Sequence, residues 1–308
     1  MASTLTPILD LSTLSLYKVK TNPISSLANQ NERRREVLKR QKEKREQKIS
    51  QLRFSANDNE SNANDKPQWP PRQHRKNTSF TCPIGMMLAE WLFSAPEDIS
   101  SWFIIPCPRG QRCMVVCQSN RTQVYGKYGN LMRTMFTQLP KQTILYCIYD
   151  YRSSIYHIID IIMWNGQDYS TQIECQCRFF MLTSLYGDSR LNKNFQILLP
   201  MKIEDKIDLI EAEDGYLFYH PLGFYESGYS PLVCWLKPFM IEEILGIKLS
   251  YPVNKPNGYI TAQAYMFEEQ SNRKEKQFVE KSHKKRNKKK EEKQQEDEGE
   301  EDLMTVDN

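Results

Sequence analysis

The chain of 308 residues has a formal net charge of +4, because its 42 Lys and Arg nearly balance its 38 Asp and Glu. Its apolar runs, such as residues 155–164, are too short to cross a bilayer, so we expect no membrane contact. No basic segment followed by a continuous apolar run opens the chain, so we expect no signal peptide. The eight cysteines lack paired CxxC spacing, so we expect reduced thiols in an intracellular protein, with no metal and no cofactor.

Composition divides the chain into five segments. We expect a leucine-rich segment at 1–16, a basic arm at 17–54, a flexible linker at 55–79, a folded domain at 80–262 and a charged, disordered tail at 263–308. Only the fourth segment has enough aromatic and β-branched residues to bury a core. The sequence therefore predicts one domain flanked by two extensions.

The first segment has apolar residues at a regular spacing: Ile8, Leu11, Leu14 and Leu16. This spacing resembles a leucine-rich nuclear export signal, which an exportin groove binds as a short amphipathic segment. The alternative is a weakly amphipathic stretch that packs on the core.

Residues 32–48 of the arm read ERRREVLKRQKEKREQK, with Val37 and Leu38 as the only apolar residues. A helix with so thin an apolar stripe has little to bury by itself. Good helix formers and nearby opposite charges favour a helix once a partner fixes it. The arm therefore predicts an acidic partner, either nucleic acid or protein.

Within the domain, the pattern predicts mainly strands joined by short loops. We expect strands at 102–106, 113–118, 143–150, 155–164, 195–199, 216–220 and 232–236, and helices at 83–92, 174–186, 203–212 and 239–245. This is an α+β domain with mainly antiparallel sheet.

One motif resembles the covalent nucleotidyltransferases, which are RNA-capping guanylyltransferases and ligases. Residues 107–112, CPRGQR, resemble their Lys-x-Asp-Gly-x-Arg motif, and 213–218 and 232–238 resemble two later strands. Those enzymes attack the α-phosphate with the motif lysine. Cys107 and Arg109 stand where the family has Lys and Asp, so we expect a nucleotide pocket that binds without chemistry.

Tryptophans and cations are the candidate ligands of that pocket: Trp91, Trp102, Trp164 and Trp235 with Arg112, Lys127 and Arg133. A methylated guanine of a capped RNA is cationic and stacks well on Trp, while Lys or Arg meets the triphosphate. For each Trp taken alone, core packing is the simpler explanation.

Several motifs in order resemble the snurportin family, whose members are import adaptors for trimethylguanosine-capped small nuclear ribonucleoproteins. The matching motifs lie at 31–38, 87–92, 107–112, 125–127, 147–149, 160–166, 214–220 and 231–238. The resemblance covers most of the chain. It implies an α+β domain that resembles the nucleotide-binding domain of mRNA capping guanylyltransferases, a helical N-terminal arm and a disordered C-terminal tail.

The resemblance also implies residue roles at the cap. Trp235 would stack on the cap base, Trp91 would contact the methylated amine, and Leu88 with Ala89 would line the opposite wall. Lys127 would meet the phosphates, with Arg112 as a second candidate.

Further roles implied by the resemblance concern protein partners. The arm would bind importin-β through basic residues: Arg33, Arg34, Arg35, Lys39 and Arg40. The 1–16 segment would bind an exportin for recycling. Such a protein shuttles between cytoplasm and nucleus and is not an enzyme.

Two alternatives remain at this point. One is a capping-type guanylyl- or nucleotidyltransferase in which Lys127 replaces the missing lysine. The other is a general RNA-binding protein, which would be indifferent to the cap and strongly salt-dependent.

Overall fold

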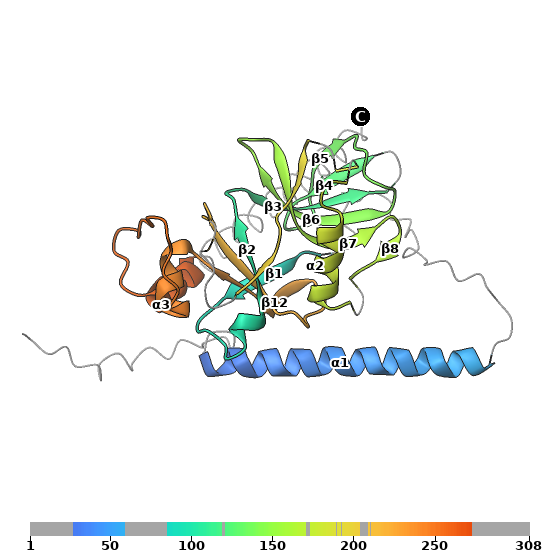
Figure 1. Cartoon of the computed structure of the whole chain (residues 1–308), viewed down its shortest axis with the longest axis horizontal. Helices are drawn as coiled ribbons and strands as arrows, with labels where there is room; N and C mark the ends of the chain where they lie inside the picture. The colour runs from blue at the N-terminus through green and yellow to red at the C-terminus, as the bar shows by residue number, and fades with distance from the viewer. Residues whose placement is uncertain are drawn as a thin grey trace, which may run out of the picture.

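The computed structural model describes residues 27–58, 85–118, 121–170, 173–188, 190–191, 193–203, 209 and 211–272. Two β-sheets pack on each other, and a long helix, α1 (Leu27–Asp58), runs along one side of them (Figure 1). The smaller sheet has the order β1 (Met87–Trp91), β12 (Gly228–Leu236), β11 (Gly215–Tyr219), β2 (Phe103–Cys107), β10 (Met201–Lys202). All its neighbours are antiparallel except the pair β1–β12, which is parallel.

The larger sheet has seven strands. Its order is β5 (Leu131–Met135), β4 (Thr122–Tyr125), β3 (Gln111–Cys117), β6 (Thr143–Asp150), β7 (Ile155–Trp164) and β8 (Gln167–Asp168). A short strand, β9 (Phe195–Ile197), runs parallel to β7, while the other pairs are antiparallel. The predicted α+β class with mainly antiparallel sheet is confirmed.

One apolar cluster joins the two sheets. Ile105 and Leu217 of the smaller sheet are fully buried with Met114 and Ile159 of the larger one. A second cluster covers another part of the smaller sheet, with contributions from α3 (Ile241–Leu245), the short 3₁₀ turn η4 (Pro238–Met240) and a helix over 262–272. Helix α2 (Cys175–Ser184) packs beside β7, and a 3₁₀ turn, η3 (Ile99–Ser101), precedes β2.

The structure corrects several predicted elements. Residues 83–92 were predicted to be a helix, but Met87–Trp91 form strand β1, because pairing with β12 outweighs their helix propensity. Of the predicted helix 203–212, residues 203, 209, 211 and 212 are not helical and the rest lie outside the described residues. Strands β4 and β5 were not predicted at all.

The ends of the predicted segments also differ. Helix α1 continues to Asp58, beyond the expected start of the linker at 55. The tail was expected from 263, but 262–272 are helical and Met266 is fully buried in the second cluster. The folded part therefore extends ten residues past the expected boundary, since 272 − 262 = 10.

A buried ion pair holds α2 to the larger sheet. Arg178 and Asp160 are both fully buried, with Arg178 Nε and Nη2 each donating at 3.0 Å to the two carboxylate oxygens. Arg178 Nη1 also donates to the carbonyls of Ile173 and Gly223. The guanidinium thus makes four hydrogen bonds at the junction of three segments.

We expect Arg178→Met to lower the free energy of unfolding by about 3–5 kcal/mol, because it leaves the Asp160 carboxylate buried and unpaired. Urea unfolding followed by circular dichroism measures the change. Lys42→Ala, which removes an exposed partner of Glu46, serves as control and should cost less than about 0.5 kcal/mol. A loss below about 1 kcal/mol for the Arg178 variant would contradict a structural role for the pair.

Candidate cap-binding and partner-binding site

The pairing of β1 with β12 brings together residues that are far apart in sequence. Leu88 pairs with Tyr229, and Trp91 pairs with Trp235, with an irregularity after Ala89 that absorbs three extra residues of β12. Leu88, Ala89 and Trp235 are partly exposed and pack against the cluster between the sheets. The sequence-predicted cap residues of the two strands therefore share one part of the fold.

Trp235 is a partly exposed ring between cations. The guanidinium of Arg112 lies 5.3 Å from its centroid and the ammonium of Lys237 lies 5.7 Å from it. Arg112 also donates to the Tyr146 hydroxyl at 3.2 Å, so it spans from the larger sheet to the smaller one. Lys237 is also paired with Asp214 at 2.5 Å, so the guanidinium of Arg112 is the main cation at this ring, and an aromatic platform beside a cation suits an aromatic ligand that carries phosphates.

Glycine at 215 lets this ring lie flat against β11. A Cβ added at Gly215 would stand 2.6 Å from Trp235 Cζ2 and 2.4 Å from the Leu236 carbonyl oxygen. The Asp-Gly step in the sequence motif therefore has a steric reason, since only glycine leaves room for the platform.

Lys127 lies close to strand β12 of the smaller sheet. It sits in the β4–β5 turn, where Gly126 N donates to the Asn130 carbonyl at 2.9 Å, and its ammonium contacts the Tyr229 hydroxyl at 3.5 Å. Since Tyr229 is the strand partner of Leu88, the turn reaches the part of the smaller sheet that holds Leu88.

Trp91 has a different setting from the one expected. Its ring is only 5% exposed, it belongs to the second cluster, and Tyr265 of the helix 262–272 stands edge-on to it at 6.4 Å. Direct contact of this ring with a cap is blocked by its neighbours in the described arrangement. Tyr265 was missed by the sequence argument because it lies in the segment expected to be a tail.

The remaining tryptophans of the candidate pocket are structural. Trp102 is fully buried, and Trp164 is 5% exposed in the third cluster, on the larger sheet. Arg133 contacts Tyr149 on that sheet at 5.4 Å. These three residues are not brought to Trp235.

At the nucleotidyltransferase-like motif, Cys107 is 1% exposed, and burial raises the pKa of its thiol to about 12. Its Sγ donates to the Ile105 carbonyl at 3.5 Å. A neutral, buried thiol is not a nucleophile near neutral pH. Residues 107–112 thus form the end of β2 and the turn to β3, and position 107, where the nucleotidyltransferases have lysine, holds no reactive group.

A polar cavity of about 700 Å³ lies at the far ends of β11 and β12. Its charges pair with one another: Lys237 Nζ lies 2.5 Å from Asp214, and Arg152 binds Glu213. Arg109, which follows the motif proline, donates its backbone N–H to Glu213. Glu213 and Asp214, the carboxylates at the start of the 213–218 motif, are therefore engaged in ion pairs rather than grouped as metal ligands.

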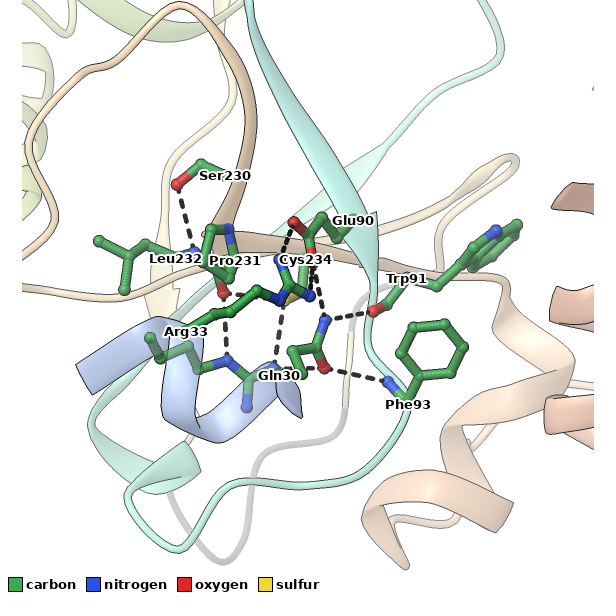
Figure 2. A network of polar contacts seen from close by, with 10 residues as sticks. Gln30, Arg33, Glu90, Trp91, Phe93, Ser230, Pro231, Leu232 and Cys234 are labelled. Carbon is green, nitrogen blue, oxygen red and sulfur yellow. Dashed lines mark hydrogen bonds and ion pairs between the residues drawn. The ribbon is translucent and has the colours of Figure 1, made fainter. Parts of the chain in front are cut away.

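The basic arm binds this chain's own domain (Figure 2). Arg33 makes a two-pronged ion pair with Glu90 at 2.6 and 2.7 Å, and this hydrogen-bonded pairing raises the pKa of Arg33. Gln30 donates to the Trp91 carbonyl at 2.8 Å and accepts from Phe93 N. The acidic partner predicted for the arm is, in this structure, strand β1.

Arg34 is buried in the same network without a carboxylate. It donates to the Pro231 carbonyl at 3.1 Å, to Asn31 at 2.6 Å and to Gln30 at 2.8 Å. Its guanidinium also lies 5.2 Å from the Trp102 centroid. Each of the three nitrogens of the guanidinium donates at least one hydrogen bond, which offsets part of the cost of burying its charge.

Farther along α1 the ion pairs become exposed, whereas one hydrogen bond stays buried. Arg40 pairs with Glu226 at 2.8 Å and Arg45 with Glu174 at 2.7 Å, while the buried Gln41 accepts from Phe224 N at 3.0 Å. Of the five residues predicted to bind importin-β, the domain engages Arg33, Arg34 and Arg40, and Arg35 and Lys39 are exposed.

Other predicted features are partly outside the described residues. The exportin-binding candidates Ile8, Leu11, Leu14 and Leu16 lie outside them.

Within the described part of the chain, no three His, Cys, Asp or Glu residues group as metal ligands. None of the described helices has the length and apolarity of a membrane span.

A family model identifies the class of protein to which this domain belongs. The model described as the Snurportin1 m3G cap-binding domain matches residues 85–238, which contain Trp235, Leu88, Ala89 and Lys127. This is the class of trimethylguanosine-cap-binding domains. A second model, described as Snurportin1, matches residues 14–54, and the chain belongs to the snurportin family of nuclear import adaptors.

Solved structures that resemble this one include DNA ligases. A Lig E DNA ligase shows 14% identity and a TM-score of 0.37 over 50% of this chain and 68% of its own. The ligase domain of LigD from M. tuberculosis shows 13% identity and a TM-score of 0.37 over 50% of this chain and 59% of its own. A mycobacterial DNA ligase D complexed with ATP and MES shows 15% identity and a TM-score of 0.38, over 50% and 60%. No argument about the site rests on these distant similarities.

We expect Glu90→Gln to loosen α1 from the domain, because hydrogen bonds between charged groups are worth about 1.5–3 kcal/mol and the substitution removes the carboxylate charge. Hydrogen exchange of the amides around residues 30–41 should speed up by roughly tenfold or more.

Glu226→Gln is the matched control, because its pair with Arg40 is exposed and should change exchange by less than about fivefold. Equal exchange in the wild type and the Glu90 variant would show that the ion pair does not hold the helix.

Proposed function

We propose that this protein binds the trimethylguanosine cap of spliceosomal small nuclear ribonucleoproteins at Trp235 and carries them to the nucleus with importin-β, after which an exportin recycles it. It would then shuttle between cytoplasm and nucleus. The observation that supports the cap site most is the Trp235 platform, partly exposed and flanked by Arg112 and Lys237. The family match to a cap-binding domain spans this platform.

Cap recognition at Trp235 would exchange one stacking partner for another. Arg112 lies over the ring, and a methylated guanine that takes the ring face would displace it. Base–aromatic stacking is worth about 1–3 kcal/mol, and the positive charge of the methylated base adds cation–π attraction. The displaced guanidinium then meets the triphosphate, as Lys127 does from the β4–β5 turn.

The apolar wall gives a reason for preferring the trimethylated base. Leu88 and Ala89 offer no carboxylate to accept a hydrogen bond from an exocyclic amine, so they suit an amine whose hydrogens are replaced by methyl groups. Trp91 remains a proposed cap-binding residue, because it pairs with Trp235 on the neighbouring strand. Movement of Tyr265 away from it would open its ring to the methylated edge of the base.

Importin-β binding would compete with the docked state of α1. Arg33 and Arg34 are bonded to Glu90, Pro231 and Gln30 in the docked state, so these contacts must break before the two guanidinium groups bind importin-β. Arg35 and Lys39 are exposed and offer the first contacts. Importin-β would then displace the helix from β1 and β12.

The enzymatic alternative has little support at this site. Nucleotidyl transfer through Lys127 requires its amine to attack an α-phosphate, yet the motif position itself holds the protonated thiol of Cys107. General RNA binding through the arm would require Arg33 and Arg34 to leave Glu90 and Pro231 for phosphates. Cap binding needs neither change.

Titration with the trimethylated and the singly methylated cap dinucleotides, followed by quenching of tryptophan fluorescence, tests the proposal. The wild-type protein should prefer the trimethylated cap. Trp235→Ala should weaken cap binding by tenfold or more, because one stack is worth about 1–3 kcal/mol.

Trp164→Phe, a buried change on the larger sheet, is the control and should leave cap affinity unchanged. Equal affinity for both caps, or full affinity in the Trp235 variant, would contradict the site. Labelled GTP with a divalent metal, run on a denaturing gel, should show no covalent adduct.

Charge reversal at the exposed arm positions tests the importin-β assignment. Arg35→Glu with Lys39→Glu should weaken importin-β binding by about tenfold or more through lost attraction between exposed and acidic surfaces, while α1 stays docked. Surface plasmon resonance gives the affinity, and cap affinity is the internal control. Unchanged importin-β affinity would place the contact elsewhere on the chain.

A further inference from the structure

The hydroxyl of Tyr225 is bonded to the main chain at the start of strand β1. It accepts from Met87 N at 3.1 Å and donates to the Gly85 carbonyl at 3.0 Å. Between these two groups lies Met86, whose carbonyl accepts from Gly228 N at 2.9 Å. These two bonds of the hydroxyl, called the Tyr225 tether below, therefore act where β1 begins to pair with β12.

Strand β1 has only one strand to hold it. It is the last strand of the smaller sheet, and β12 is its single neighbour among the described strands. A backbone N–H has one hydrogen to donate, and Met87 gives it to Tyr225. The tether thus supplies a main-chain bond that an edge strand lacks on one side.

Tyr225 is itself held firmly. Its ring is 6% exposed in the apolar cluster between the sheets, and the Arg178 guanidinium lies 6.0 Å from its centroid. Arg178 also donates to the carbonyl of Gly223, two residues earlier in the same loop. Burial raises the pKa of the Tyr225 hydroxyl well above its usual value, so the hydroxyl stays protonated and keeps its donor for Gly85.

The tether lies directly before the apolar wall of the proposed cap site. Leu88 and Ala89 follow Met87 in the chain, and both pack against the cluster that contains Tyr225. Trp235 lies on β12, which is paired on both sides, with β1 and with β11. Loss of the tether should therefore move the wall and leave the stacking ring in place.

We propose that Tyr225 is a positioning residue for cap selectivity, which fixes Leu88 and Ala89 at contact distance from the methyl groups of a base stacked on Trp235. Attraction between apolar atoms falls steeply with separation, since a gap of about 0.5–1 Å already loses a quarter to a half of it. The inference rests on the proposed cap-binding function and deepens it, because selectivity and stacking then depend on different residues.

Tyr225→Phe removes the hydroxyl and keeps the ring. Equilibrium titrations with the trimethylated and the singly methylated cap dinucleotides, followed by tryptophan fluorescence, measure the preference. Affinity for the trimethylated cap should fall by about fivefold or more, the ratio that one hydrogen bond is worth. Affinity for the singly methylated cap should stay within about twofold, because the stack on Trp235 remains.

Tyr219→Phe is the matched control. Tyr219 lies in the same cluster and is 1% exposed, and its hydroxyl is buried without a hydrogen-bond partner among the described residues, so its removal should leave the preference unchanged. Ser227→Ala removes an exposed second hydrogen bond to the Gly85 carbonyl, 3.0 Å long, and should lower the preference by about twofold. If Tyr225→Phe does not fold, an unchanged preference in the Ser227 variant overturns the tether.

The outcomes separate this inference from the cap site itself. A wild-type protein without preference for the trimethylated cap would overturn the proposed selectivity. A wild-type preference that Tyr225→Phe retains would overturn the positioning role alone. An equal loss in the Tyr225 and Tyr219 variants, or an equal loss for both caps, would assign the effect to a loosened core and overturn the positioning role as well.

Discussion

The parallel pairing of β1 with β12 is the constraint on which the rest of the site depends. It places Leu88, Ala89 and Trp235 against the apolar cluster between the sheets, and it presents Glu90, the Pro231 carbonyl and Cys234 to α1. Adjacent residues of the same two strands therefore contact the cluster and the arm. A shift of either strand that changes its contacts with the arm also changes its contacts with the cluster, because backbone hydrogen bonds join both strands in one sheet.

The arm docks by polar groups rather than by apolar surface, and this decides how it can leave. Among the side chains of α1 that the structure describes, residues 30, 33, 34, 37, 38 and 41 form the less exposed stripe, and four of these six are Gln or Arg. Each of the four makes at least one hydrogen bond to the domain, which offsets part of the cost of burying it, although Arg33 Nε and Gln41 Nε2 are buried without a partner among the described residues. When the helix leaves, the same groups regain water or a new acidic partner, so undocking costs less than exposing an apolar stripe of equal area. Polar docking thus gives a defined position with a modest holding energy.

The sequence predicted the elements whose pattern is local and missed those decided by distant partners. Strands 143–150 and 155–164 were predicted to the residue, because long runs of β-branched and aromatic side chains need both faces buried. Strand β1 was predicted to be a helix, since Leu88, Ala89 and Glu90 are helix formers and only the pairing with β12 makes them extended. The stripe of Gln30, Arg34 and Gln41 has helical spacing, but a search for apolar residues passes over it.

The same distinction applies to the site. Gly215 and Trp235 were recognisable from motifs. They lie in contact on neighbouring strands, where a side chain at position 215 would collide with the Trp235 ring. The cover of Trp91 by Tyr265, and the bridge from Lys127 to Tyr229, depend on how separate sheets and helices meet. No spacing along the chain encodes such meetings. They follow from the packed core, and the core is set by many residues at once.

The placement of the arm and of Trp235 has a consequence for an adaptor. Helix α1 bonds to side chains or backbone of Glu90, Pro231, Phe224, Glu226 and Glu174, and of the proposed cap residues it contacts only Trp91, through the main-chain carbonyl. A ligand at Trp235 and an importin-β molecule that removes α1 would therefore use different groups of the domain. Cargo and carrier can then be held together, and the link between them is thermodynamic, through the shared strands β1 and β12.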